Sequence, residues 1–183
     1  MANNTGYGVV YTPHSLSEYV ANLLIEEYNK DATTDIQKDS DISVLDPACG
    51  EGALLSAVEQ IIGSRQEHQN FSLTGIDVEE DVIRNNRKNF DRTRYTFYSK
   101  DALLPSETKA PVEFWRSKGV NPTLIIANPP WSSEKLYDKK RLSDAGYRFD
   151  IGQYDSYVLF CLQTSIRFVH AKNFDVNNLG TTS

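Results

Sequence analysis

The chain has 183 residues, and its hydrophobic content of 39% and charged content of 24% are ordinary for a soluble globular domain with a substantial core. Its net charge of −6 argues against autonomous, tight binding of nucleic acid, which needs a basic face, but not against a catalytic domain whose DNA-gripping part lies elsewhere. No apolar run approaches a membrane span, and the N-terminus lacks the basic and apolar regions of a secretory signal.

The predicted elements alternate between helices and strands. Apolar residues at helical spacing predict a first helix over 14–29. The next elements are strands at 42–48, 71–77 and 94–100, with helices over 53–63 and 79–90 between them. The remainder is a surface connection over 104–122 with one helical turn around Phe114 and Trp115, a buried strand at 124–126, a polar loop over 132–152 and a helix over 154–171. This order predicts an α/β fold with a doubly wound, mostly parallel sheet.

Only four strands are predicted, so the sheet is incomplete and its fourth strand forms an apolar edge that another chain segment could pair with. The two cysteines, Cys49 and Cys161, lie in apolar surroundings without ligand spacing, which favours a reduced, cytoplasmic protein. The three histidines form no cluster, and we expect no metal site.

Three successive strands end in residues suited to a nucleoside. Gly50 and Gly52 turn the first strand into a helix and let backbone N–H groups approach a ligand, although the third glycine of a dinucleotide fingerprint is replaced by Leu55. Asp77 ends the second strand, where a ribose is bound in such folds, and Asp101 follows the third, where a carboxylate can accept from an adenine amino group. The simpler interpretations are a tight packing turn and acids that favour a helix N-terminus. Together these strand ends predict a nucleoside pocket at the carboxyl edge of the sheet.

The fourth strand runs into Asn128, Pro129, Pro130 and Trp131. Prolines lack an N–H group and hold the backbone extended, so the Asn128 side-chain oxygen and the Pro129 carbonyl become two fixed acceptors. Accepting both hydrogens of an aromatic amino group favours a pyramidal nitrogen whose lone pair points outward, which is electrostatic preorganisation. Trp131 offers a face on which an extruded base could stack. The alternative is a proline-rich strand terminator with a half-buried Trp.

In these motifs the chain resembles the adenine-specific (N6) DNA methyltransferases of restriction–modification systems, which use S-adenosylmethionine. The matches run over about residues 6–170 in the gamma-type order of that family: "YTP" before a helix, then "VLDPACGEGALL", "GID", "KDALL", "IANPPW" and "YDSYVLFCLQTSI". The resemblance implies a Rossmann-like class I methyltransferase fold. It also implies S-adenosyl-L-methionine as the cofactor and the N6 amino group of adenine in DNA as the methyl acceptor.

The resemblance further implies a role for each matched residue. Thr12 and Pro13 would line the methionine end of the cofactor, and Phe160 would pack near its adenine. The other cofactor contacts would be Asp46, Ala48, Gly50 and Gly52 at the methionine part, Asp77 at the ribose and Asp101 at the adenine amino group. The catalytic set would be Asn128, Pro129, Pro130 and Trp131. Methyl transfer would be an in-line displacement at the sulfonium, governed by positioning.

The expected organisation is an N-terminal helix with the "TP" motif in 1–30, a cofactor-binding catalytic region in 31–172 and a polar tail in 173–183. Members of the family continue with three more strands and a target-recognition domain, to which nothing here corresponds. We therefore expect a truncated catalytic region whose partner DNA is bound largely through parts missing from this chain. A specificity subunit or the rest of a larger restriction–modification protein is a further expected partner, and a membrane is not.

Two other functions remain open at this point. Protein-glutamine N5-methyltransferases share "NPP" followed by an aromatic residue, usually Tyr, whereas Trp131 and a "YTP" motif directly before a helix favour the DNA branch. The second alternative is a non-catalytic cofactor-binding or interaction domain whose sheet edge docks a partner chain. The presence of both Asn128 and Asp77 argues against such a loss of catalysis.

Overall fold

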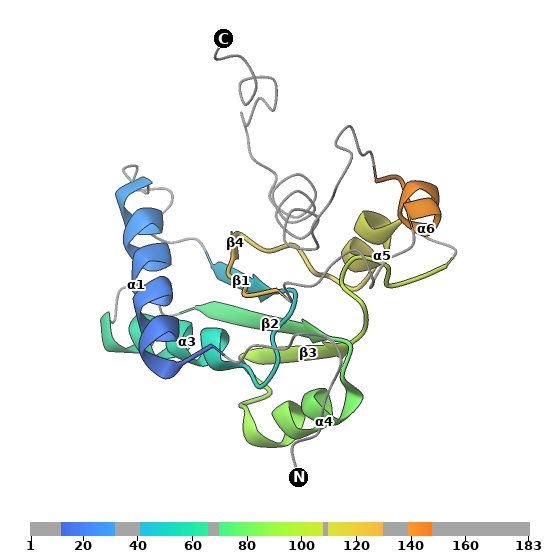
Figure 1. Cartoon of the computed structure of the whole chain (residues 1–183). Helices are drawn as coiled ribbons and strands as arrows, with labels where there is room; N and C mark the ends of the chain where they lie inside the picture. The colour runs from blue at the N-terminus through green and yellow to red at the C-terminus, as the bar shows by residue number, and fades with distance from the viewer. Residues whose placement is uncertain (1–11, 32–40, 66–69, 108–109, 130–138, 148–183) are drawn as a thin grey trace.

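The computed structural model describes residues 12–31, 41–65, 70–107, 110–129 and 139–147, and Figure 1 shows them as a parallel sheet flanked by helices. The strands are β1 (Ile42–Asp46), β2 (Phe71–Asp77), β3 (Tyr95–Ser99) and β4 (Leu124–Ile125). The helices are α1 (His14–Asp31), α3 (Ala53–Arg65), α4 (Glu80–Asn89), α5 (Pro111–Ser117) and α6 (Lys139–Asp144). The strand order is β3-β2-β1-β4, and every pair is parallel.

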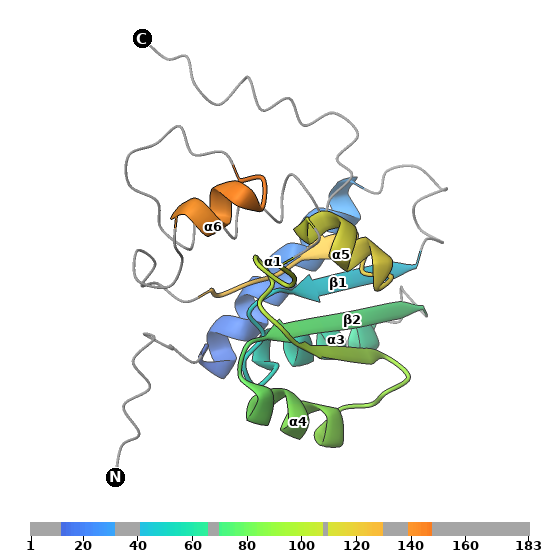
Figure 2. The ribbon, with the colours of Figure 1, turned by 90° about the vertical axis from the view of Figure 1, so that its right-hand side faces the viewer.

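The sheet is buried on both faces, as a parallel sheet normally is. Successive side chains of a strand point to opposite faces, so Val44 joins the hydrophobic cluster with α1, α3 and α4, while Leu45 joins the cluster with α5 and α6. In Figure 2 α3 lies behind the sheet and α5 in front of it. Because β2 and β4 lie on opposite sides of β1, the direction of winding reverses between β1 and β4. Ligands of open α/β sheets bind outside the carboxyl ends of the strands at such a switch point.

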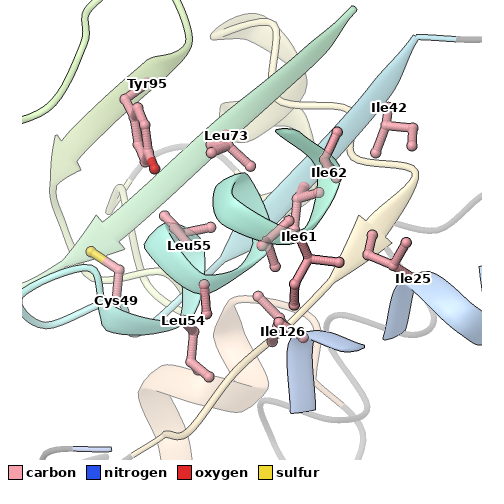
Figure 3. Packing of buried hydrophobic residues seen from close by; sticks show 14 of the residues in the cluster. Ile25, Ile42, Cys49, Leu54, Leu55, Ile61, Ile62, Leu73, Tyr95 and Ile126 are labelled. Atoms are coloured by element: carbon pink, nitrogen blue, oxygen red, sulfur yellow. The ribbon is translucent and has the colours of Figure 1, made fainter. Parts of the chain in front are cut away.

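The first cluster is built around α3. Figure 3 shows the side chains of this helix, among them Leu55 and Ile62, packed with Leu73 of β2 and with Ile25 of α1 at one side. All four of these side chains are almost completely buried. This packing fixes α1 and α3 on the sheet. It thereby also holds the residues just before each helix, which are Thr12 and Pro13 before α1 and the glycine turn before α3.

The second cluster holds the segment that follows β3. The fully buried Trp115 of α5 donates its indole N–H to the carbonyl oxygen of Ala102 over 2.9 Å. Tyr147, just after α6, donates its hydroxyl to the carbonyl oxygen of Leu103 over 2.7 Å. Two consecutive carbonyls are thus fixed by large side chains, one from α5 and one from the residues just after α6.

The fold class, the strands β1 to β3 and the helices α1, α3 and α4 confirm the sequence predictions. The fourth strand is shorter than predicted, and Leu124 and Ile125 are half-buried because β4 lies at the edge of the described sheet. Its pairing continues one residue further, where the Ile126 N–H donates to the Leu45 carbonyl over 3.0 Å.

Two helices differ from the sequence expectation. The single turn expected around Phe114 and Trp115 is a seven-residue helix, α5, which begins at a proline, a favoured first helical residue. Part of the predicted loop over 132–152 is the helix α6, which lacks a repeating apolar stripe but buries Leu142 in the second cluster. The predicted helix over 154–171 lies outside the described residues. None of the helices in the described ranges is long and apolar enough to cross a membrane.

Candidate functional site

The side chains predicted to form the site converge at the carboxyl edge of the sheet. Asp46 is the last residue of β1 and pairs in register with Gly75, two residues before the end of β2. Asp77 ends β2 opposite Ser99, the last residue of β3. Since parallel strands end at the same edge of a sheet, Asp46 and Asp77 share one rim with the acid that follows β3 and the amide that follows β4.

The glycine turn after β1 is folded back onto β2 and α4. The Cys49 N–H donates to the Ile76 carbonyl over 2.9 Å, and the Gly52 N–H donates to the Cys49 carbonyl over 2.8 Å. Gly50 and Gly52 have φ angles of +48° and +84°, in the region that favours glycine. A Cβ atom on Gly52 would lie 3.0 Å from the ring of Phe90, so this glycine also permits close packing against the end of α4.

Asp77 ties this turn to the end of β2. One carboxylate oxygen, Oδ2, accepts the Gly50 N–H over 2.8 Å, and the other, Oδ1, accepts the Glu79 N–H over 2.9 Å. The simpler interpretation from the sequence, that Asp77 favours the N-terminus of the following helix, is therefore partly correct, because Oδ1 binds the residue that precedes α4. Each carboxylate oxygen has two lone pairs, so both can accept a second hydrogen bond, such as one from a ribose hydroxyl.

The N–H groups of both glycines are used within the protein. The sequence suggested that backbone N–H groups of this turn approach a ligand, yet Gly50 donates to Asp77 and Gly52 donates to Cys49. The Gly50 carbonyl is also engaged, because the side-chain amide of Asn86 donates to it over 2.8 Å. Asn86 lies on α4 and is only 4% exposed. Sequence reasoning missed this residue.

Asp46 is a buried acid with one unsatisfied oxygen. Its side chain is 1% exposed, and Oδ1 accepts the Ala48 N–H over 3.0 Å. Oδ2 has no hydrogen-bond partner among the described residues. The pKa of this carboxyl is raised to about 7, chiefly by burial and to a smaller extent by the nearby Asp77 carboxylate, while the hydrogen bond from Ala48 opposes both effects. A buried oxygen without a partner is unfavourable, so a ligand ammonium or amine at this position would fit the site.

Asp101 shapes the segment after β3. Its Oδ1 accepts the N–H groups of Leu103 and Leu104 over 2.8 and 3.0 Å. The carbonyls of Ala102 and Leu103 are held from the second cluster, as described above. The position of the half-buried Asp101 is thus fixed by its own side-chain bonds and by its neighbours' carbonyls.

The "TP" motif before α1 and the "NPP" motif after β4 meet in the structure. The Asn128 side-chain amide donates to the hydroxyl oxygen of Thr12 over 3.0 Å, although 116 residues separate the two in sequence. Both side chains are half-buried, and Pro129 is buried. The exposed Pro13 begins the first turn of α1, where its carbonyl accepts the N–H groups of Leu16 and Ser17 over 3.0 Å. Pro130, Trp131 and Phe160 lie outside the part of the chain that the structure describes.

Comparison with known proteins assigns this chain to a family. The family model described as N-6 DNA Methylase matches residues 1–163. The Type II methyltransferase M.BanIII of Aneurinibacillus aneurinilyticus is 26% identical over 167 residues, which are 87% of this chain and 28% of that relative. The chain therefore spans less than a third of the length of this curated relative.

A solved structure from Listeria monocytogenes, assigned to the class I S-adenosylmethionine-dependent methyltransferases, is similar with a TM-score of 0.61 and 22% identity. The similarity covers 90% of this chain and 46% of the other. This likeness confirms the Rossmann-like class I methyltransferase fold. Because the family model covers most of its length, this chain belongs to the N-6 DNA methylase family.

Proposed function

We propose that the protein moves a methyl group from S-adenosyl-L-methionine to the N6 amino group of adenine in DNA. The hydrogen bond between Thr12 and Asn128 carries this proposal, because it joins the "TP" and "NPP" motifs at the carboxyl edge of the sheet. Membership of the N-6 DNA methylase family supports the same chemistry. A glycine turn, a buried acid and a strand-end acid lie on the neighbouring strands of that edge.

The residues of the edge match the groups that the cofactor presents. The unsatisfied Oδ2 of Asp46 would accept the ammonium of the methionine part, and the second lone pairs of Asp77 would accept the ribose hydroxyls. Asp101 would accept the adenine amino group. The remaining proposed contacts are Thr12, Pro13, Ala48, Gly50, Gly52 and Phe160. The bound cofactor supplies an electrophilic methyl group on a sulfonium.

Asn128 and Pro129 would orient the target amine. The bond to Thr12 is donated by the side-chain nitrogen of Asn128, whereas the acceptor of this amide is its side-chain oxygen. This oxygen and the Pro129 carbonyl would accept the two N6 hydrogens and favour the pyramidal nitrogen that attacks the methyl carbon. Trp131, after Pro130, would stack on the extruded base. The new N–C bond forms as the C–S bond breaks, and the displaced N6 proton passes to water.

The proposed setting is a cytoplasmic restriction–modification system. The named relative is a Type II methyltransferase. A net charge of −6 gives this chain no general attraction to phosphates, so we propose that DNA is held mainly by protein parts outside it, such as a specificity subunit or further domains.

The proposal is tested by incubating the full-length protein, with the parts proposed to hold DNA, with S-adenosylmethionine labelled in its methyl group and unmethylated genomic DNA. We expect label in N6-methyladenine after nucleoside analysis by mass spectrometry. Asn128→Ala should lower the rate at least about 100-fold, because it removes a preorganised acceptor, while S-adenosylhomocysteine binding measured by calorimetry stays unchanged. Label in protein instead of DNA would favour glutamine methylation, and strong residual transfer by Asn128→Ala would overturn the role of this amide.

A further inference from the structure

The Gly50 residue is held from both sides by side chains of other elements. Its N–H group donates to Asp77 at the end of β2, and its carbonyl accepts from Asn86 on α4, both over 2.8 Å. The first bond orients the peptide before Gly50 and the second orients the peptide after it. Two side chains therefore define the backbone torsions of the residue that is intrinsically the most free.

Asn86 is an unusual choice for a position that only packs. Its side chain is 4% exposed, and a buried amide is unfavourable unless it is hydrogen-bonded. Asparagine is also a weaker helix former than alanine or leucine. The preceding buried residue on the same helix, Ile83, is apolar and lies in the first cluster. The bond to the Gly50 carbonyl is thus the feature that distinguishes Asn86 from a packing residue.

The location of this bond connects it to the candidate cofactor site. Asp77 reaches the same glycine that Asn86 holds, so any movement of the Gly50 peptide also disturbs the proposed ribose acceptor. The turn in addition carries Ala48, whose N–H donates to the buried Asp46. A loose turn would have to be ordered again by each ligand, and this ordering reduces affinity.

We propose that Asn86 is a positioning residue of the cofactor site, which holds the Gly50 carbonyl so that the glycine turn and Asp77 are preorganised for S-adenosylmethionine. This inference rests on the proposed function. Asn86 does not touch the ligand but acts through Gly50. Loss of the Asn86 amide should therefore weaken the affinity for the cofactor and raise the KM for the cofactor. It should leave kcat at saturating cofactor unchanged.

The first measurement is the rate of amide hydrogen exchange in the chain, monitored by NMR in the absence of ligand. In Asn86→Leu, exchange at Gly50 and Gly52 should become about tenfold faster, whereas amides in the centre of β2 keep their wild-type rates. Asn86→Ala is the second variant, since alanine is the best helix former and its methyl group needs no space that the asparagine side chain does not already fill. Asn85→Leu removes an exposed amide from the adjacent position, and Ile83→Val weakens the packing of the same helix. Both controls should leave the exchange of the two glycines as in the wild type.

The second measurement is calorimetry with S-adenosylhomocysteine on the same proteins, far below their unfolding temperatures. We expect about three- to tenfold weaker binding for both Asn86 variants and wild-type affinity for both controls. Equal binding by the wild type and the Asn86 variants would overturn the positioning role and leave the proposed function intact. Equal losses in the Ile83→Val control would overturn it as well, since they would show a general effect of stability. A wild-type chain that does not bind the ligand would instead refute the cofactor assignment, and with it this inference.

Discussion

Replacement of the buried acid Asp46 by asparagine should make the protein more stable, and increasingly so as the pH rises. Burial raises the pKa of this carboxyl from its ordinary value of 3.8 to about 7 in the folded chain. Between these two pKa values the native state therefore keeps a proton on Asp46 that the unfolded state has already lost. A folded-state pKa above the unfolded one means that stability falls as the pH rises from about 4 to about 7 and stays low beyond it.

The size of the effect follows from these two pKa values. With about 1.4 kcal/mol for each pH unit between them, Asp46 lowers the free energy of unfolding by about 2 kcal/mol at pH 5 and by about 4 kcal/mol at pH 8. The side chain introduced by Asp46→Asn would keep an oxygen for the Ala48 N–H and carry no charge, at the cost of one amide group without a partner. That cost does not vary with pH. The advantage of Asp46→Asn should hence grow by about 2–3 kcal/mol between pH 5 and pH 8.

Urea unfolding of both proteins at several pH values between 5 and 8 measures this difference. Asp91→Asn is the matched control, because Asp91 is exposed and its pKa is lowered by hydrogen bonds from Thr93. Its contribution to stability is present at neutral pH and is lost only as the pH falls through the acidic range, so its difference from the wild type should stay constant from pH 5 to pH 8. A difference for Asp46→Asn that is equally constant would show that Asp46 titrates normally and would refute the reasoning.

Two further predictions concern the contact between the motifs and the packing of β2. Thr12→Val keeps the shape of the side chain but removes the acceptor of the Asn128 amide, so we expect about tenfold slower methyl transfer to DNA. Thr12→Ser keeps the hydroxyl and should restore the rate. Equal rates for the valine and serine variants would contradict this role of Thr12. Gly75→Ala would bring a Cβ atom within 2.7 Å of the Phe97 ring and 2.8 Å of the Cys49 sulfur, so urea unfolding should show a loss of about 1–3 kcal/mol. Gly63→Ala in α3 meets nothing within 4 Å and should instead add about 0.5–1 kcal/mol; a Gly75→Ala protein as stable as the wild type would refute the close packing.

The sequence predicted the parts of the fold that follow from local pattern. Apolar runs and turn signals predicted β2 with its observed bounds and β1 two residues too long. The strand ends identified Asp77 and Asp101 as residues of one edge, whereas Asp46 was named only through the family resemblance. The helix α6 escaped prediction because its six residues carry no apolar period, and burial of Leu142 supports it only once the sheet and α5 are in place. The short β4 likewise reflects its place at the edge of the described sheet.

The details of the site could not be predicted because they depend on contacts between distant residues. Asn86 is 36 residues from Gly50 in sequence, and its role depends on the rotation of α4 relative to the turn. The same holds for Thr12 and Asn128, whose motifs were each recognised but whose bond spans 116 residues. The spacing of Asn86, three residues after Ile83 and four before Phe90, puts a polar residue on the apolar side of the predicted helix and could have directed attention to it.

The claim that the carboxyl edge of the sheet binds S-adenosylmethionine is tested most directly by calorimetry with S-adenosylhomocysteine on three proteins. These are the wild type, Asp77→Ala and Asp81→Ala, which removes an exposed acid of α4 paired with Arg84. We expect binding by the wild type and by Asp81→Ala with equal affinity, and at least about tenfold weaker binding by Asp77→Ala, because a carboxylate that accepts from ligand hydroxyls is lost. Unchanged affinity in Asp77→Ala, or no binding by the wild type, would contradict the account.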